Sequence, residues 1–255
     1  MATDPSGGSP SPGQAREGLL PPPSRVGAVV PAAGRGERLP GAAPKQFRPL
    51  AGMPLLWHPL YRLAQSGVVG AIVLVVPPGS LRAIELPPAL GLPLQVIEGG
   101  ARRQDSVERG LLALPPGVEW AVVHDGARPL LPPGLVRACL AGAQETGAAL
   151  AALPVSDTVK RGGAGGFAEG TLPREGLWLA QTPQAARREL LEKALRAARE
   201  AGREGTDEAA LLEAIGVRVR LVPGDPVNLK VTRAEDLALA EAYLALAGAE
   251  RGGAA

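Results

Sequence analysis

Short apolar runs alternate with amphipathic stretches along most of this chain, between about residues 25 and 248. The runs at 26–31, 71–76 and 120–124 contain few polar side chains, as expected of strands that are buried on both faces of a parallel sheet. Between such runs, apolar residues recur at the spacing of helices. The alternation predicts an α/β fold with a mostly parallel sheet that is covered by helices on both faces.

The same pattern predicts the remaining elements. We expect strands at 94–98, 148–153 and 218–222, and a short extended piece at 228–231. Helices are expected at 54–66, 80–86, 104–113, 133–145, 184–201, 206–215 and 232–247. The last helix would begin at a capping box, in which the side chains of Thr232 and Glu235 bond to backbone N–H groups.

Residues 155–183 interrupt the alternation of strands and helices. This stretch is rich in glycine and has few candidates for a core, yet it carries Thr158, Arg174 and Trp178. A segment of this length without a core of its own is unusual inside a compact domain unless it is functional or contacts another chain. We therefore predict an arm or hairpin that projects from the domain.

Composition narrows the classes of protein that fit. The 255 residues can form one large α/β domain or two small ones, and 45% hydrophobic with 20% charged residues is typical of a globular protein. The formal net charge of +2 is too small to indicate a nucleic-acid or membrane partner. We expect a disordered segment at 1–24, one folded domain at 25–248 and a disordered tail at 249–255.

The location and the redox chemistry follow from what the sequence lacks. No apolar run approaches the roughly 20 residues that span a bilayer, and the N-terminus does not have the pattern of a signal peptide. We therefore expect a cytoplasmic protein. Cys139 is the only cysteine, so an intrachain disulfide is excluded, and we expect this residue to be buried on a helix.

The densest chemistry follows the first predicted strand. Small residues that expose the backbone are followed by two cations, Arg38 and Lys45, on a loop with prolines. Bare N–H groups together with two positive charges are typical of a cradle for phosphate. The small residues are Pro31, Ala32, Ala33, Gly34 and Gly36.

The two common nucleotide motifs do not describe this loop. A dinucleotide-binding turn needs a third glycine where Leu39 stands, and a Walker A loop needs Lys and Ser or Thr where Ala42 and Ala43 stand. A glycine- and proline-rich surface turn with solvated charges remains the alternative interpretation.

Three further clusters carry candidate chemistry. Asp125 and Arg128 follow a buried strand, where Asp125 suits Mg²⁺ or a substrate hydroxyl and Arg128 suits a phosphate. Lys230, one of only four lysines in an arginine-rich chain, precedes a predicted helix. Gly99 to Ser106 is a weaker signal, in which glycines precede a helix. No Ser or Cys beside His124 suggests a nucleophile that it could activate, and we expect His124 to have a structural role.

Taken together and in order, these motifs resemble the signature of the cytidylyltransferases that act on 2-C-methyl-D-erythritol 4-phosphate. The resemblance covers about 25–248. It rests on Pro31-Ala-Ala-Gly-x-Gly-x-Arg38, Pro44-Lys45-Gln46, His124-Asp-x-Ala-Arg-Pro129, Asp157-Thr158, Thr182-Pro183-Gln184, Thr206-Asp207-Glu208 and Asn228-x-Lys230-Val-Thr232.

The resemblance implies a fold, a reaction and partners. It implies a Rossmann-like α/β fold of the nucleotidyltransferase type and a homodimer formed through the 155–183 arm. It also implies a need for Mg²⁺ or another divalent cation, and transfer of CMP from CTP to methylerythritol phosphate with release of pyrophosphate in the non-mevalonate isoprenoid pathway. No nucleic-acid or membrane partner is implied.

The resemblance also assigns roles to residues by position. Arg38, Lys45 and Lys230 would bind the CTP phosphates and stabilise the transition state. The small residues at 31–36 would hold the nucleotide. Gly100 and Ser106 match positions that read the cytosine. Contacts to methylerythritol phosphate would come from Asp125, Arg128, Thr158, Thr206 and, from the neighbouring subunit, Arg174; Asp125 is also the one candidate metal ligand.

Some positions depart from the family pattern, and other functions stay open. Ala101 and Val227 stand where relatives often have acidic residues, and Gly126 replaces a common alanine, a change that should be tolerated. A fusion with a second isoprenoid enzyme is not expected. A ribitol 5-phosphate cytidylyltransferase and a non-catalytic nucleotide-binding protein remain alternatives.

Overall fold

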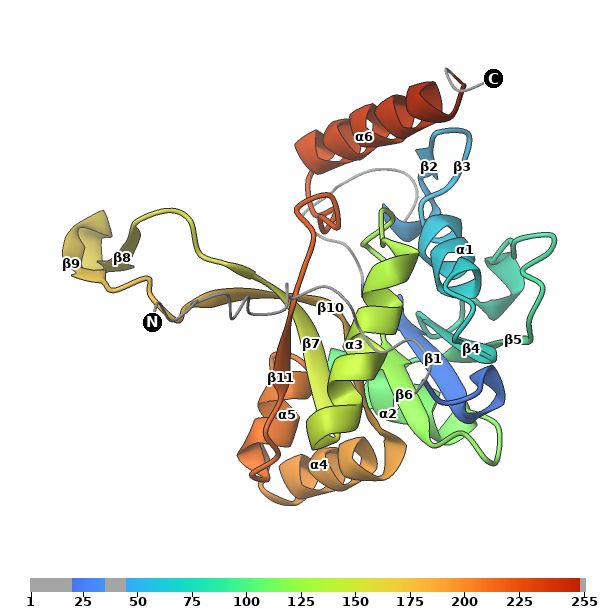
Figure 1. The fold of residues 1–255 in the computed structure, drawn as a ribbon, viewed down its shortest axis with the longest axis horizontal. Helices are drawn as coiled ribbons and strands as arrows, with labels where there is room; N and C mark the ends of the chain where they lie inside the picture. Colours follow the sequence, from blue (N-terminus) through green and yellow to red (C-terminus); the bar gives the residue numbers. More distant parts are fainter. Residues whose placement is uncertain (1–19, 35–44, 253–255) are drawn as a thin grey trace, which may run out of the picture.

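A seven-stranded sheet forms the centre of the protein in the computed structural model, which describes residues 20–34 and 45–252 (Figure 1). The strand order across the sheet is β11-β7-β10-β6-β1-β4-β5, and within this sheet only β10 runs antiparallel to its neighbours. The predicted mostly parallel sheet is confirmed. The strands are β1 (Val26–Pro31), β4 (Ala71–Val76), β5 (Leu94–Glu98), β6 (Trp120–Val123), β7 (Ala148–Pro154), β10 (Trp178–Arg187) and β11 (Arg220–Pro223).

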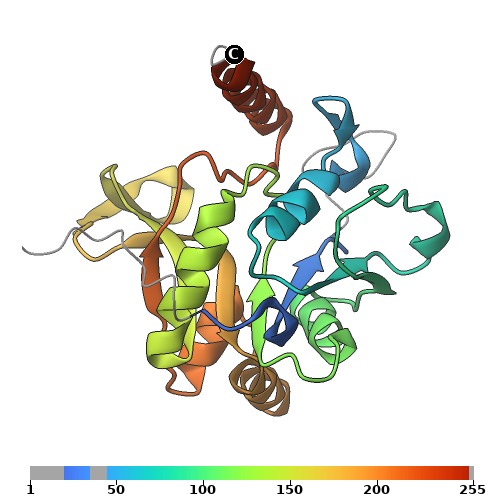
Figure 2. The ribbon, with the colours of Figure 1, turned by 45° about the vertical axis from the view of Figure 1, so that its right-hand side comes forward.

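Helices cover both faces of this sheet, as the alternation in the sequence predicts (Figure 2). α1 and α3 pack on one face, and α2, α4 and α5 pack on the other. The helices are α1 (Trp57–Gln65), α2 (Arg103–Ala113), α3 (Pro133–Thr146), α4 (Arg188–Glu200), α5 (Glu208–Ala214) and α6 (Ala234–Gly252). Among the described residues, no helix is both long enough and apolar enough to cross a membrane.

β1 serves both layers because side chains of a strand alternate between its faces. Ala28 and Val30 pack with α1 and α3, whereas Val29 packs with α2, α4 and α5. α2 lies very close to this strand, since a Cβ at Gly110 would overlap Val29. This close packing fixes α2, whose first residues reach the carboxyl end of the sheet.

A hairpin of β8 (Val159–Gly162) and β9 (Ala168–Leu172) projects away from the sheet (Figure 1). It confirms that a projecting segment exists, but the predicted arm of 155–183 is too long. From Trp178 onward the chain forms β10, which lies between β7 and β6 in the sheet. We call residues 155–177 the arm.

β10 also shortens the helix that was predicted at 184–201. Ala185 and Ala186 are compatible with either structure, but they are buried in the sheet, and the helix begins only at Arg188. Pro183 lies where the pairing with β7 shifts register, a position at which a strand tolerates proline.

The other differences concern element ends. The predicted helix at 80–86 contains only the single turn η4 (Leu81–Ala83), and α1 begins at Trp57 rather than at residue 54, because β2 (Pro49–Leu50) and β3 (Met53–Pro54) precede it. The 3₁₀ turns η2 (Pro23–Arg25), η3 (Lys45–Phe47) and η5 (Ala164–Gly166) complete the elements of the described residues.

The C-terminal helix α6 packs on the β2–β3 hairpin through a small core of its own that includes Leu50, Val231 and Ala240. The predicted capping box of Thr232 and Glu235 is wrong, since α6 begins only at Ala234. Asp236, not Glu235, accepts hydrogen bonds from the backbone and hydroxyl of Thr232, at 2.7 Å each. The last turn before α6 is thereby tied down close to Lys230.

Candidate active site at the carboxyl edge of the sheet

The parallel strands end at one edge of the sheet, and many predicted site residues follow these ends. β1 has β4 on one side and β6 on the other. In open α/β sheets, ligands bind outside the carboxyl ends of strands at such a reversal of strand order. Residues 32–34 follow β1, residues 124–128 follow β6, and residues 228–230 come after β11.

Asp125 is the central charge of this edge, because a cation lies against each oxygen of its carboxylate. Arg103 Nη2 is 3.0 Å from Oδ1, and Lys230 Nζ is 2.7 Å from Oδ2. Burial disfavours the charge of Asp125, but the positive charges of Arg103 and Lys230 outweigh burial and hold its pKa well below the usual range. The carboxylate is therefore ionised at neutral pH.

Arg103, the first residue of α2, binds a second carboxylate. Its Nη1 is 2.7 Å from Glu208 Oε1, and its Nη2 is 3.0 Å from Glu208 Oε2. Burial opposes the charge of Arg103, but Glu208 and Asp125 outweigh it and raise the pKa of the guanidinium further. Arg103 is not among the residues predicted from the sequence, because arginine is common in this chain and its partner Glu208 lies 105 residues away.

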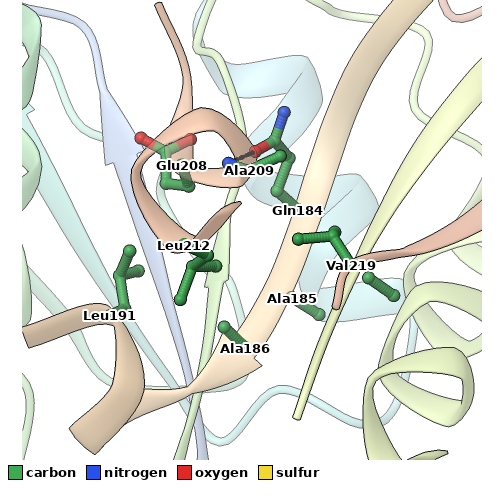
Figure 3. Close-up of a pocket in the computed structure, with 9 residues that line it drawn as sticks. Gln184, Ala185, Ala186, Leu191, Glu208, Ala209, Leu212 and Val219 are labelled. Carbon is green, nitrogen blue, oxygen red and sulfur yellow. Dashed lines mark hydrogen bonds between the residues drawn. The ribbon is translucent and has the colours of Figure 1, made fainter. Parts of the chain in front are cut away.

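The position of Glu208 is set by β10. Gln184 donates from Nε2 to Asp207 Oδ2 at 2.9 Å. Its Oε1 accepts from the N–H of Ala209 at 2.8 Å (Figure 3). Asp207 caps α5 by accepting from the N–H of Ala210. Figure 3 shows Glu208 next to the bond between Gln184 and Ala209, on the first turn of α5. The sheet therefore holds the helix end that supplies the second carboxylate.

His124 links β6 to β10 through a chain of hydrogen bonds. Its Nε2 lies 3.1 Å from the carbonyl oxygen of Arg128, so Nε2 carries the proton. Nδ1 then accepts from the hydroxyl of Thr182 at 3.0 Å, and the same hydroxyl oxygen accepts from the N–H of Asp125 at 3.0 Å. His124 is completely buried, as its expected structural role requires, and it fixes the backbone of Asp125.

A second polar network holds the segment that carries Lys230. Asn228, completely buried, donates from Nδ2 to the carbonyl of Thr182 at 2.7 Å and to Gln181 Oε1 at 3.3 Å. The backbone carbonyl of Asn228 accepts a hydrogen bond from Arg128 Nη1 at 2.8 Å. Among the described residues, Asn228 Oδ1 and Arg128 Nε find no hydrogen-bonding partner. The network positions the segment of Lys230 and contains two buried polar atoms without a hydrogen bond.

The part of the edge next to β1, where the resemblance predicts the nucleotide, is built from backbone and small residues. Gln46 donates from Nε2 to the carbonyl of Ala32 at 3.1 Å and so ties η3 to the end of β1. Ser106 is almost completely buried, and its hydroxyl accepts from the N–H of Gly100 at 3.1 Å. In this conformation the Ser106 hydroxyl holds the backbone of Gly100 in place.

Several predicted residues lie in or next to the part of the chain that the structure leaves out. Gly36 and Arg38 lie outside the described residues. Lys45 begins η3, but its side chain is also outside them. Gly34 is exposed, and no atom lies within 4 Å of the place that a Cβ would occupy there. The phosphate-cradle prediction therefore stays a prediction.

Three further predicted residues are exposed. Thr158 and Arg174 are exposed on the arm, which points away from the ends of β1 and β6 (Figures 1 and 2). Arg174 donates to the carbonyl of Ser156. Thr206 is exposed just before α5. Of the predicted residues whose side chains the structure describes, Asp125, Arg128 and Lys230 are the charged groups that lie close together in one chain.

One departure from the family pattern acquires a physical reason. A Cβ at Gly126 would lie 2.8 Å from Leu56 Cδ1 and 3.2 Å from the Cβ of Ala32. An alanine at this position would require these neighbours to shift. Leu56 therefore fills the space that a methyl group would take.

The described side chains do not form a metal centre. Within residues 20–34 and 46–247, no group of three or more His, Cys, Asp or Glu side chains is placed to hold an ion. Asp125 is the candidate ligand, and both its oxygens already contact cations. Its role as a metal ligand stays a prediction, and these ion pairs count against it.

Comparisons with known proteins point in one direction. A sequence model of the family described as "IspD: 2-C-methyl-D-erythritol 4-phosphate cytidylyltransferase" matches residues 26–246. A 2-C-methyl-D-erythritol 4-phosphate cytidylyltransferase of Pelotomaculum thermopropionicum is 46% identical over 224 residues, which cover 86% of this chain and 94% of that protein. The bifunctional enzyme IspD/IspF of Desulfotalea psychrophila is 46% identical over 219 residues, 85% of this chain and 56% of that longer protein.

Solved structures agree with the sequence comparisons. The crystal structure of the 2-C-methyl-D-erythritol 4-phosphate cytidylyltransferase from Thermus thermophilus superposes with a TM-score of 0.72 at 38% sequence identity. The match covers 85% of this chain and 97% of that one.

Proposed function

Because the chain belongs to the IspD family of 2-C-methyl-D-erythritol 4-phosphate cytidylyltransferases, we propose that it transfers CMP from CTP to 2-C-methyl-D-erythritol 4-phosphate. The products are 4-diphosphocytidyl-2-C-methyl-D-erythritol and pyrophosphate, in the non-mevalonate supply of isoprenoid precursors. The observation that carries the proposal most directly is the cluster of Arg103, Arg128 and Lys230 around Asp125, beside the small residues that end β1.

The reaction makes one bond and breaks another. A phosphate oxygen of the acceptor attacks the α-phosphorus of CTP, and the bond between the α-phosphorus and the bridging oxygen to the β-phosphate breaks to release pyrophosphate. A phosphate monoester is already an anionic nucleophile, so no strong general base is needed. The protein has to overcome the repulsion of two anions and hold them in line. Lys230, with Arg38 and Lys45 as predicted from the sequence, supplies that positive charge.

Asp125 and Arg128 suit the acceptor. An ionised carboxylate accepts hydrogen bonds from the hydroxyls of a polyol, and a guanidinium binds phosphate. Arg128 lies near Asp125 and adds positive charge to this edge, although its Nη1 already donates to the Asn228 carbonyl. Gly100 and the backbone at 32–34 would hold the nucleotide, and Ser106 would contribute by shaping the Gly100 loop.

We propose that the reaction requires Mg²⁺ or another divalent cation. Bound to phosphate oxygens, such a cation neutralises charge that develops during transfer. The described side chains offer no cage for it, and Mg²⁺ commonly relies on substrate phosphates for part of its coordination. We therefore assign no step to a metal held by Asp125.

We further propose a cytoplasmic homodimer in which the arm reaches the partner. Phe167, at the hairpin, is 77% exposed, and Leu179 and Trp178 at the arm's base are exposed as well. Apolar side chains gathered on a projecting segment favour contact with another molecule. Arg174 and Thr158 would then complete the phosphate site of the partner, which explains why they lie far from Asp125 in their own chain.

The test is pyrophosphate release from CTP, measured with methylerythritol phosphate and with ribitol 5-phosphate, each with and without Mg²⁺. We expect release with methylerythritol phosphate and Mg²⁺. Preference for ribitol 5-phosphate would establish the alternative acceptor, and no release with either polyol phosphate would favour a non-catalytic nucleotide-binding protein. Replacement of Arg38 or Lys45 by alanine should reduce turnover by at least ~10²-fold, and near-normal turnover in both would contradict the assignment.

A further inference from the structure

Asp125 holds two cations that differ in how firmly they are fixed. Arg103 binds Oδ1 and is gripped from its other side by Glu208, through bonds of 2.7 and 3.0 Å. Glu208 is 2% exposed and lies at a helix end that hydrogen bonds attach to β10, so the carboxylate that holds Arg103 is fixed in position. Lys230 binds Oδ2 at 2.7 Å from the segment before α6, and 39% of its side chain is exposed. Lys230 is therefore the cation that can leave.

The proposed reaction draws Lys230 away from Asp125. An ammonium group has three N–H donors, and a lysine that faces the α-phosphate of CTP turns at least part of its hydrogen bonding from the carboxylate of Asp125 to a phosphate oxygen. A buried carboxylate that loses its cation is strongly destabilising, because its lost hydration is then not compensated. Asp125 would resist the exchange if Lys230 were its only counter-ion.

We propose that Arg103 is a positioning residue that keeps Asp125 charge-paired while Lys230 moves from Asp125 to the phosphates of CTP. This inference rests on the proposed function and assigns a step within it. Arg103 acts through Asp125 and Lys230 and does not itself touch the reacting atoms. Its bidentate bond to Glu208 keeps the guanidinium in place through the exchange.

A simpler role has to be separated from this one. Arg103 also neutralises the buried Glu208, and loss of that pair alone would destabilise the fold. Both roles predict that R103Q is damaging. The two roles differ in what they predict when Glu208 is neutralised. E208Q removes the charge of Glu208 but leaves the bond between Arg103 and Asp125 in place. R103Q/E208Q removes the carboxylate that R103Q leaves unpaired at position 208, but it does not give Asp125 a cation again.

The experiment compares wild type, R103Q, R103K, E208Q and R103Q/E208Q by thermal unfolding and by the kcat and KM of pyrophosphate release. In R103Q we expect kcat to fall between about 10- and 100-fold, the scale of a misplaced reacting group. R103K, with one point charge for two carboxylates, should be intermediate, and E208Q should retain most of its kcat. R103Q/E208Q should unfold at a higher temperature than R103Q, but its kcat should be as low as that of R103Q.

The neighbouring Arg102 provides a matched control. It stands one residue earlier and pairs with Asp105, at 2.7 Å, rather than with Asp125. R102Q should leave kcat unchanged. A double variant that regains wild-type kcat, or an E208Q variant that loses as much kcat as R103Q, would overturn the proposal.

Calorimetry with CTP separates this proposal from the proposed function. If wild type binds CTP but releases no pyrophosphate with any polyol phosphate, the proposed function fails. In that case the CTP affinities of wild type and R103Q still test whether Arg103 has the proposed role. We expect R103Q to bind CTP roughly tenfold more weakly than wild type, because Lys230 stays on Asp125, and R102Q to bind it normally. Equal affinities of R103Q and wild type would overturn the role of Arg103.

Discussion

The cluster around Asp125 and the arm are built in opposite ways. Around Asp125, side chains from α2, β6, β10, α5 and the segment before α6 bond to one another, and His124 and Asn228 are completely buried. On the arm, Thr158 and Arg174 are exposed, and Phe167 is 77% exposed. The cluster is positioned by one chain, whereas the bonds of the arm's side chains, such as that of Arg174 to the Ser156 carbonyl, stay within the arm and leave these side chains exposed.

This difference separates preorganisation from assembly. Buried polar networks in which most groups are satisfied hold catalytic groups at fixed positions before any ligand arrives. An exposed hairpin keeps its conformational freedom until a partner orders it, so the free energy of ordering is drawn from binding. The site would therefore join a rigid part from one subunit with an adaptable part from the other. Four predictions test this division.

The largest effect is expected from Lys230→Ala. Removing a cation that stabilises the transition state should reduce kcat by at least ~10²-fold. The fold should survive, because Lys230 is partly exposed and Asp125 keeps Arg103 as a partner. Steady-state pyrophosphate release and thermal unfolding measure both effects. Lys193→Ala, at an exposed site on α4, is the control and should leave kcat unchanged. Unchanged kcat in Lys230→Ala would remove the cluster from the chemistry.

The next effect tests the arm, through mixed dimers of Arg174→Ala and Lys230→Ala chains. Each variant alone should be nearly inactive. If Arg174 acts in the partner's site, about half of randomly formed dimers are mixed and each has one intact site, so activity should recover to about a quarter of wild type. Pyrophosphate release after co-expression of the two chains measures this recovery. No recovery, with mixed dimers shown to form, would place Arg174 in its own subunit's site.

How well each part could be predicted from the sequence follows from how far apart the interacting residues lie. The strands at 26–31 and 71–76 were predicted with their observed bounds, because continuous apolar runs give a local signal. Asp125 and Lys230 were found by their places at element ends. The pair of Arg103 and Glu208 was not found, because it joins residues 105 positions apart and no local pattern marks it.

β10 shows the same limit for the fold. The run from Trp178 to Arg187 begins exposed, includes Thr182-Pro183 and ends in alanines, so its sequence fits a loop followed by a helix. Only the pairing with β6 and β7 makes it a strand, and that pairing depends on residues at 120–123 and 148–154. Tertiary context here overrides local propensity.

A smaller effect is expected from acid, through His124. Burial lowers the pKa of His124 from 6.5 to about 4, although its bond to the Arg128 carbonyl opposes the shift. The unfolded chain therefore takes up the proton first, and the free energy of unfolding should fall as pH drops from 6.5 to about 4, by roughly 3 kcal/mol in total. Above pH 6.5 this contribution is constant.

Urea unfolding of wild type and His124→Gln at several pH values measures this contribution. Burial lowers the pKa of His58 as well, so both proteins should lose stability in acid, but the variant should lose it with a smaller slope. Equal slopes between pH 6.5 and 4 would mean that His124 is accessible to protons in the folded protein, and the rigid part would then be less closed than its hydrogen bonds indicate.

The smallest effect compares one glycine from each region. In Gly126→Ala the new methyl group meets Leu56 Cδ1 at 2.8 Å inside the packed cluster, so the variant should be destabilised by about 1–3 kcal/mol, the usual result of overpacking. In Gly170→Ala, on β9, nothing lies within 4 Å of the added Cβ, and the smaller entropy of the unfolded chain should stabilise the protein by about 0.4–1 kcal/mol. Denaturant unfolding at several protein concentrations measures both. If Gly170→Ala loses stability and the loss grows on dilution, a partner covers this strand. If Gly126→Ala has the stability of wild type, Leu56 can move, and the cluster around Asp125 is less rigid than its buried hydrogen bonds indicate.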